Sequence, residues 1–229
     1  PTQFGPNEDY SSYPRDFDRD FDRITVSGGH VVFAPTVDEI YPDGFSTRVE
    51  VDGLTERLCG ASRPGHFSGV ATVVAKLFGA VKPHAAVFGQ KDAQQVLVVR
   101  RLTRDLNLDV EVLVSPTIRE PDGLARSSRN VHLSVAERRH APILFSALQE
   151  GEHLIRMGIR NRGLVLDRMT SLLARVPDSV IDYVEAVDAE SLKSESCLGP
   201  VTLLALAVKF GRARLIDNVI VDLPICPPK

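Results

Sequence analysis

Hydrophobic residues recur along the chain at spacings typical of alternating helices and strands. Phe17, Phe21 and Ile24 fall at i, i+4 and i+7 among Asp and Arg residues, and this spacing predicts a helix with one apolar face. The apolar run over 30–34 predicts a strand, and the alternation over 47–51 predicts an exposed strand. The first part of the chain is therefore expected to mix helices and strands.

The middle of the chain shows the clearest alternation. The pattern predicts a helix over about 67–81, a buried strand over 85–88, a second helix that carries Gln94 and Gln95, and another strand over 109–114. This order is typical of a doubly wound parallel sheet, which places the protein in the α/β class. Ligands of such sheets bind past the carboxyl ends of the strands.

The last part of the chain has helices followed by strands, which indicates a smaller α+β domain. We therefore predict two domains, over 1–117 and 118–229. Asp217 and Asn218 indicate a bulge or bend in the last strand. The predicted elements are one long helix over 134–157, a helix over 162–175, and strands over 181–187, 201–210 and 215–222.

Composition and charge exclude several function classes. The formal net charge is -3, which gives no electrostatic footprint for nucleic acid or an anionic membrane, and the chain has no Trp to stack on bases. An anionic substrate must then be met by a local basic cluster. The longest apolar run, 201–208, is too short to span a bilayer, and no signal-peptide pattern is visible. We expect a cytoplasmic protein.

The cysteines do not suggest a disulfide framework or a zinc site. Cys59, Cys197 and Cys226 are odd in number, lie far apart and lack C-x-x-C spacing. We expect buried free thiols in a reducing compartment.

The segment after the strand at 85–88 carries candidate chemistry for phosphate binding. Gly89 has no Cβ and lets a ligand approach the backbone, and Lys91 can reach a phosphate as a point charge. Asp92 can cap the next helix or accept a hydrogen bond from a ribose hydroxyl. An ordinary strand-to-helix turn with a solvated lysine is the alternative interpretation.

Two further segments have more than one interpretation. Ser127 and Ser128 beside Arg129 can form an anion cradle, because hydroxyls and a guanidinium both donate to phosphate oxygens. The same serines can serve as a helix N-cap. His66, at the start of a predicted helix, can bind a ligand or can be a surface or capping residue.

Several separated motifs, taken together, resemble the pantoate–β-alanine ligase (pantothenate synthetase) family. The resemblance extends over nearly the whole chain, from residue 1 to about residue 221. The motifs are Pro-x-Gln-Phe at 1–4, Tyr-Pro-Asp-Gly at 41–44, Arg-Pro-Gly-His-Phe at 63–67, Gly-x-Lys-Asp-x-x-Gln at 89–95 and Ser-Ser-Arg-Asn at 127–130.

The resemblance implies an enzyme of the coenzyme A pathway with a Rossmann-like, nucleotidyltransferase-type domain. In this family pantoate and ATP give pantoyl adenylate and pyrophosphate, and the amine of β-alanine then gives pantothenate and AMP. Mg²⁺ accompanies the ATP, no metal is held by protein ligands alone, and the enzyme is a homodimer. Nucleic acid and membranes are not partners.

The resemblance also implies roles for residues of this chain. Gln3 and Gln95 would hold pantoate, and Ile118 would offer backbone groups to adenine. Lys91, Ser127, Ser128 and Arg129 would be the catalytic residues. The residues expected to bind ATP are Gly89, Gln90, Lys91, Asp92, Ile118, Arg126, Ser127, Ser128 and Arg129.

The departures from the family pattern concern both the beginning of the chain and single residues. The family carries a His-x-Gly-His motif after its first strand, and neither the motif nor that strand is in this sequence. We therefore expect this chain alone to be catalytically impaired. Gln90, Ala93 and Arg126 stand where the family usually has a glutamate, an aromatic and an apolar residue. A non-catalytic ligand-binding or dimerising fragment, or a related ligase for a different acid, remains an alternative.

Overall fold

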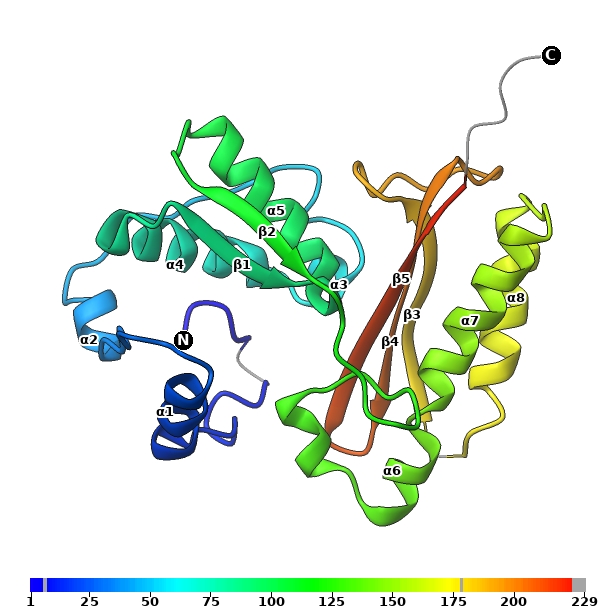
Figure 1. The fold of residues 1–229 in the computed structure, drawn as a ribbon. Helices are drawn as coiled ribbons and strands as arrows, with labels where there is room; N and C mark the ends of the chain where they lie inside the picture. Colours follow the sequence, from blue (N-terminus) through cyan, green and yellow to red (C-terminus); the bar gives the residue numbers. More distant parts are fainter. Residues whose placement is uncertain (6–7, 178, 224–229) are drawn as a thin grey trace.

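The computed structural model describes residues 1–5, 8–177 and 179–223. Its strands form a two-stranded parallel sheet and a three-stranded antiparallel sheet (Figure 1). The α-helices are α1 (Phe17–Val26), α2 (Val37–Ile40), α3 (Cys59–Ser62), α4 (His66–Val81), α5 (Ala93–Asp105), α6 (Val135–His140), α7 (Ile143–Arg156) and α8 (Arg162–Leu173). Two 3-10 helices are η1 (Gln90–Asp92) and η2 (Ser128–His132). The strands are β1 (Ala85–Gly89), β2 (Glu111–Ser115), β3 (Ser179–Asp188), β4 (Val201–Phe210) and β5 (Ala213–Asp222).

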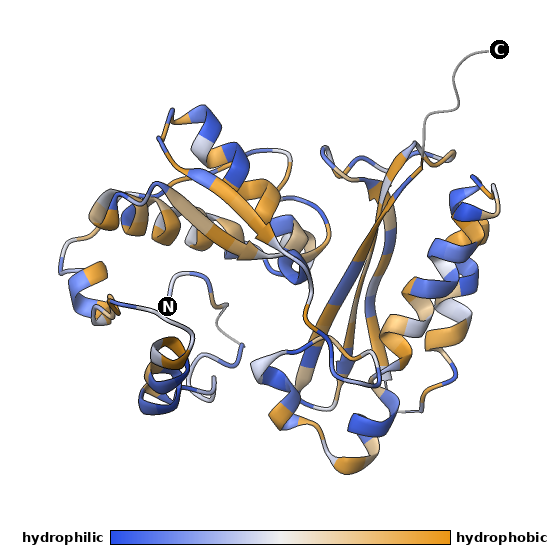
Figure 2. Cartoon of the chain, in the orientation of Figure 1, coloured by the Kyte–Doolittle hydropathy of each residue, from blue (hydrophilic) through white to orange (hydrophobic). Residues whose placement is uncertain are grey.

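Strands β1 and β2 pair in parallel, with α5 as the crossover between them. This confirms the predicted order of helix, strand, helix and strand and the α/β class. The predicted burial of the first strand is wrong, because Val87 is 66% exposed and Leu113 on β2 is also exposed. Within the described residues β1 pairs with β2 alone, so this mostly hydrophobic sheet keeps exposed positions (Figure 2).

The antiparallel sheet has the order β3-β4-β5. Strand β5 pairs with β4 without interruption, so the bulge predicted at Asp217 and Asn218 is wrong. These two residues pair with Leu206 and Ala205 and are buried. The register shift of this sheet lies in β3. A polar pair inside a regular, buried strand requires hydrogen-bond partners from elsewhere in the fold.

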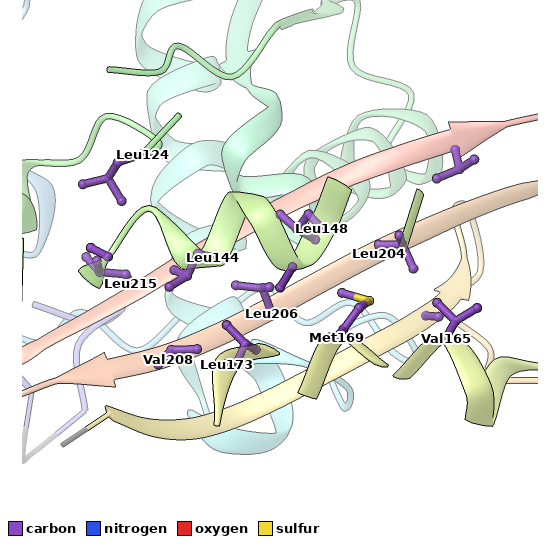
Figure 3. Close-up of a cluster of buried hydrophobic side chains, with 14 of the residues drawn as sticks. Leu124, Leu144, Leu148, Val165, Met169, Leu173, Leu204, Leu206, Val208 and Leu215 are labelled. Atoms are coloured by element: carbon purple, nitrogen blue, oxygen red, sulfur yellow. The ribbon is translucent and has the colours of Figure 1, made fainter. Parts of the chain in front are cut away.

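Two hydrophobic clusters share the central strand β4. On one face of the sheet, Leu204 and Leu206 pack against residues of α7 and α8 such as Leu148 and Met169 (Figure 3). On the other side, Leu203 and Ala205 belong to a cluster that contains residues of α4 and α5. This second cluster contains residues from both sides of the predicted boundary between 117 and 118, and that boundary stays a prediction.

The long helix predicted over 134–157 is two helices, α6 and α7. The interruption occurs at Pro142, because proline has no N–H to donate to the carbonyl of Arg138. The capping predicted from Ser134 is present, since its hydroxyl accepts from the N–H of Glu137.

Two predicted strands near the beginning of the chain are wrong. Residues 30–34 and 47–51 are described by the structure and form no strand. The N–H of Val49 donates instead to the hydroxyl of Thr72 on α4, at 2.9 Å. The predicted helix is present as α1, but its apolar residues are exposed, with Phe17 at 61%. Of the described helices, none is both long and apolar enough to cross a membrane.

Replacement of Leu206 by alanine tests whether β4 is the centre of the fold. The side chain is fully buried, so Leu206→Ala is expected to reduce the free energy of unfolding by about 2–5 kcal/mol through the lost transfer energy and the cavity left behind. Urea denaturation measures this. Val180→Ala on β3, where the side chain is exposed, is the control and should change it by less than about 0.5 kcal/mol. Equal losses in the two variants would contradict the assignment.

Candidate active site

A cavity lies where η1 and the start of α5 meet strand β5. It is located past the carboxyl end of β1, where ligands of open α/β sheets bind. Apolar residues from β4 and β5 form part of its wall, among them Leu203 and Ile216. The polar residues that line it are Arg63, His66, Lys91, Asp92, Gln94, Gln95, Tyr183, Asp217 and Asn218.

Lys91 and Asp92 belong to the turn that follows β1. The Lys91 side chain is 19% exposed, and its Nζ lies 3.8 Å from Oδ2 of Asp92. Asp92 occupies the N-cap position of α5, but its side chain makes no capping hydrogen bond. Among the described residues, neither the ammonium nor the carboxylate forms a hydrogen bond that a ligand would have to break.

The consecutive residues Gln94 and Gln95 have different tasks. The buried Gln94 amide donates to the carbonyls of Leu54 and Arg57 at 2.8 and 2.7 Å, and it accepts from the N–H of Cys59 at 3.0 Å. It therefore closes the turn that precedes α3. Gln95, one position later on α5, lines the cavity, where its amide can both donate and accept.

Gln3 lies beside the cavity through its backbone. Its carbonyl accepts from His66 Nδ1 at 2.7 Å and from Arg63 Nη2 at 3.4 Å, and both partners line the cavity. The helix α4 comes close to this segment because Gly69 has no side chain. A Cβ there would lie 2.2 Å from the carbonyl oxygen of Thr2.

The hydrogen bonds of His66 fix one neutral tautomer, with the proton on Nδ1. Its Nδ1 donates to a carbonyl, so Nε2 must accept the hydrogen bond from Arg63 Nη1, which is 2.9 Å long. Burial and the adjacent Arg63 guanidinium lower the pKa of His66 from 6.5 to about 4. Glu8 pairs with the same guanidinium, with 2.5 Å between Nε and Oε1. His66 is thus a partly buried, neutral residue of the cavity wall and makes no capping hydrogen bond, and a ligand role for it stays a prediction.

The segment predicted to bind phosphate is attached to residues 9–13. Arg129 forms a bidentate ion pair with Asp9, with N–O distances of 2.7 and 2.8 Å. The Ser128 hydroxyl donates to the Tyr13 hydroxyl at 3.0 Å. Ser127 accepts from the N–H of Arg129 at 3.2 Å and is the N-cap of η2, so the capping interpretation holds for Ser127.

The predicted site residues do not all meet at the cavity. Lys91, Asp92 and Gln95 line it, and Gln3 contacts two of its lining residues through its carbonyl. Of the described residues, these predicted ones are not among its lining: Gly89, Gln90, Ile118, Arg126, Ser127, Ser128 and Arg129.

Ile118 and Arg126 are joined outside the cavity. The carbonyl of Ile118 accepts from the N–H of Arg126 at 2.9 Å, and both side chains are exposed. Arg126 Nε lies 3.1 Å from Oε1 of Glu120. This extra positive charge is thus paired with a carboxylate on the same loop.

Sequence reasoning missed several residues of the cavity wall. Asp217 and Asn218 gave a signal, since a polar pair inside an apolar strand needs partners, but we interpreted it as a bulge. Tyr183 gave no signal; its hydroxyl lies 3.2 Å from the free thiol of Cys59, which also lines the cavity. Cys197 is also a free thiol but is exposed, so the predicted burial holds for Cys59 and is wrong for Cys197, and Cys226 lies outside the described residues.

Carboxylates, imidazoles and thiols do not gather into a metal site in the part of the chain that the structure describes. No group of three or more His, Cys, Asp or Glu side chains there could hold a metal ion. The donor set at the cavity is instead one of ammonium, guanidinium and amide groups, which suits anionic and hydroxylated ligands.

Comparisons with known proteins show the family to which the chain is similar. A family model described as "Pantoate-beta-alanine ligase" matches residues 1–220. A pantothenate synthetase of Acetivibrio thermocellus is 53% identical over 97% of this chain and 79% of its own length.

Two solved structures are similar over most of the chain. A pantothenate synthetase of Thermus thermophilus has a TM-score of 0.93 and 48% identity, over 97% of this chain and 80% of that one. A pantoate–β-alanine ligase of Francisella tularensis, complexed with "Beta-gamma ATP and Beta-alanine", has a TM-score of 0.76 and 32% identity, over 96% of this chain and 76% of that one.

The two neighbouring glutamines provide a matched test of the site. Gln94→Ala leaves buried backbone groups without partners, and each such group is expected to cost about 1–3 kcal/mol of unfolding free energy. Gln95→Ala should change it by less than about 0.5 kcal/mol, because this amide carries no structural hydrogen bond among the described residues. Urea denaturation of both variants measures the free energies of unfolding. A larger loss for Gln95→Ala than for Gln94→Ala would refute the assignment of the two side chains.

The lowered pKa of His66 predicts a pH dependence of stability. The unfolded chain binds a proton at His66 below about pH 6.5, whereas the folded protein does so only near pH 4. Stability is therefore full above 6.5 and falls as the pH is lowered toward 4. Denaturation between pH 7 and 5 isolates this effect from the carboxylates, which titrate at lower pH. His66→Gln should flatten the profile in this window, and an unchanged slope would show that His66 is not responsible.

Proposed function

The chain belongs to the pantoate–β-alanine ligase family, and we propose that it joins pantoate to β-alanine at the expense of ATP. The observation that carries the proposal is the cavity past the carboxyl end of β1, lined by Lys91, Asp92 and Gln95. Cationic and amide groups meet there beside an apolar wall. This suits a substrate that has a carboxylate, hydroxyls and a hydrocarbon portion.

The first step joins two anions. A carboxylate oxygen of pantoate attacks the α-phosphorus of ATP, and the bond from that phosphorus to the pyrophosphate oxygen breaks. The repulsion between the reactants is offset only if cations lie between them. In our proposal Lys91 takes this role from the turn after β1, and Gln3 and Gln95 hold the hydroxyls and carboxylate of pantoate.

The second step transfers the acyl group. The neutral amine of β-alanine attacks the carbonyl carbon of pantoyl adenylate, the bond from that carbon to the AMP oxygen breaks, and the nitrogen loses a proton to solvent. No covalent bond to the protein forms in either step. The protein contributes position and charge, and such contributions are large in a site that excludes water.

In our proposal the phosphate loop, Arg126 to Arg129, closes on ATP by exchanging partners. Arg129 would leave Asp9 for a phosphate, and Ser128 would leave Tyr13. Both members of the ion pair retain about a quarter of their exposure, so a phosphate can approach them from solvent. The exchange would replace one charge-assisted bidentate pair by another. Ile118, Gly89 and Gln90 would follow the nucleotide, and Asp92 would face its ribose.

We extend the proposal to the metal and the assembly. Mg²⁺ usually takes one or two carboxylates together with substrate phosphates, so it would enter with ATP and neutralise phosphate charge. We further propose a cytoplasmic homodimer with domains over 1–117 and 118–229.

Exchange of labelled pyrophosphate into ATP tests the function directly. The full-length protein should catalyse this exchange when pantoate is present. Lys91→Ala should lower the rate about 10²–10³-fold, the usual effect of removing one electrostatic donor to a developing charge. Gln95→Ala should raise the KM for pantoate more than the KM for ATP.

The matched control is Lys82→Ala, at the far end of α4, which should exchange at the normal rate. Exchange with another hydroxy acid but not with pantoate would favour a related ligase of different specificity. A Lys91→Ala protein that exchanges as fast as its parent would refute the proposed site.

A further inference from the structure

Asn218 on β5 holds the turn that carries Lys91. Its side-chain amide donates to the carbonyls of Gln90 and Lys91 at 3.0 and 2.8 Å, and its Oδ1 accepts from the Gln90 side chain at 3.0 Å. The residue is 4% exposed. Both amide hydrogens are thus directed at the backbone that bears the Lys91 side chain, from a strand 127 positions away in the sequence.

Asp217, the preceding residue, holds a second segment. Its carboxylate accepts two hydrogen bonds from Arg119, at 2.6 and 2.9 Å. Arg119 Nη1 also donates to the carbonyl of Gly123 at 3.0 Å, and its guanidinium lies 3.8 Å from the centre of the Phe145 ring. Arg119 therefore attaches the loop that begins at Ile118 to the same strand.

The supporting strand is a regular, paired element, whereas the two segments it holds are not part of a sheet. Strand β5 pairs with β4 along its whole length, and its neighbours belong to the buried clusters of the sheet. The segments themselves are a short 3-10 turn and a loop. Reactive groups carried on such segments need support from an element that does not move, because a misplacement of about 1 Å can reduce the rate about 100-fold.

We propose that Asn218 and Asp217 are positioning residues for the ligation reaction, acting through Lys91 and through the loop that follows Ile118. The proposal rests on the proposed function, since it assigns them to that reaction. Neither residue needs to contact a substrate. Asn218 fixes where the Lys91 ammonium points, and Asp217 fixes the start of the loop that leads to the phosphate-binding residues.

A double-mutant cycle tests whether Asn218 acts through Lys91. Asn218→Ala in the full-length protein should lower kcat for pyrophosphate exchange about 10–100-fold, with little change in the KM for pantoate. In a Lys91→Ala background the same substitution should lower kcat no further, because the group it positions is absent. Its effect on thermal stability should be the same in both backgrounds.

A second variant protects the test against loss of folding. Asn218→Asp keeps the size of the side chain and can still accept from Gln90, but it loses both donors to the backbone of the turn. It should reproduce the kcat defect. Asn161→Ala is the control: it removes a hydrogen bond to the N–H of Leu164 at the start of α8 and should leave kcat unchanged.

The outcomes separate the two claims. Suppose that the parent protein exchanges pyrophosphate and that Lys91→Ala is impaired. If Asn218→Ala then exchanges at the parental rate, or if its effect adds in full to that of Lys91→Ala, the positioning role is refuted and the proposed function stands. If Lys91→Ala has no effect, the proposed site itself fails. Asp217→Asn should raise the KM for ATP more than the KM for pantoate, and equal KM values in variant and parent would refute its share of the proposal.

Discussion

The structure depends on one strand being buried on both faces. Residues of β4 alternate between a cluster with α7 and α8 and a cluster with α4 and α5, so the strand belongs to two cores at once. The buried middle of β4, from Leu203 to Val208, accordingly carries only apolar side chains. Polar side chains enter this region from the neighbouring strands, Tyr183 from β3 and Asp217 and Asn218 from β5, and they find partners in other elements.

This constraint explains the distribution of charge around the site. Asp217 is 2% exposed, and burial raises its pKa, although the Arg119 guanidinium opposes that shift. Glu8 shows the reverse balance: burial would raise its pKa, but Arg63 holds it below its ordinary value. Asp217 and Glu8 are thus each paired with an arginine, and among the described residues Lys91 has only the half-exposed Asp92 within ion-pair distance.

Local patterns in the sequence correctly predicted those helices and strands whose formation depends on local interactions. The helix over 67–81 and the three strands of the last part are present because their apolar spacing agrees with their packing. The helix predicted over 134–157 is interrupted at Pro142. Because the effect of a proline on a helix is local, this interruption could have been foreseen from the sequence. Strands over 30–34 and 47–51 could not be judged in this way, because a strand requires a partner and its pairing is a tertiary property.

The same division applies to the candidate site. Lys91, Asp92 and Gln95 could be predicted because they share one motif, whereas Asn218 reaches the site only through the fold. Even within the motif, residue type did not decide the role. Gln94 and Gln95 are identical in chemistry, but consecutive positions on a helix point about 100° apart, so one amide closes a backbone turn and the other lines the cavity. What a side chain contributes to a site is therefore determined by the direction that its helix, turn or strand gives it. For the turn that carries Lys91, strand β5 sets that direction through Asn218.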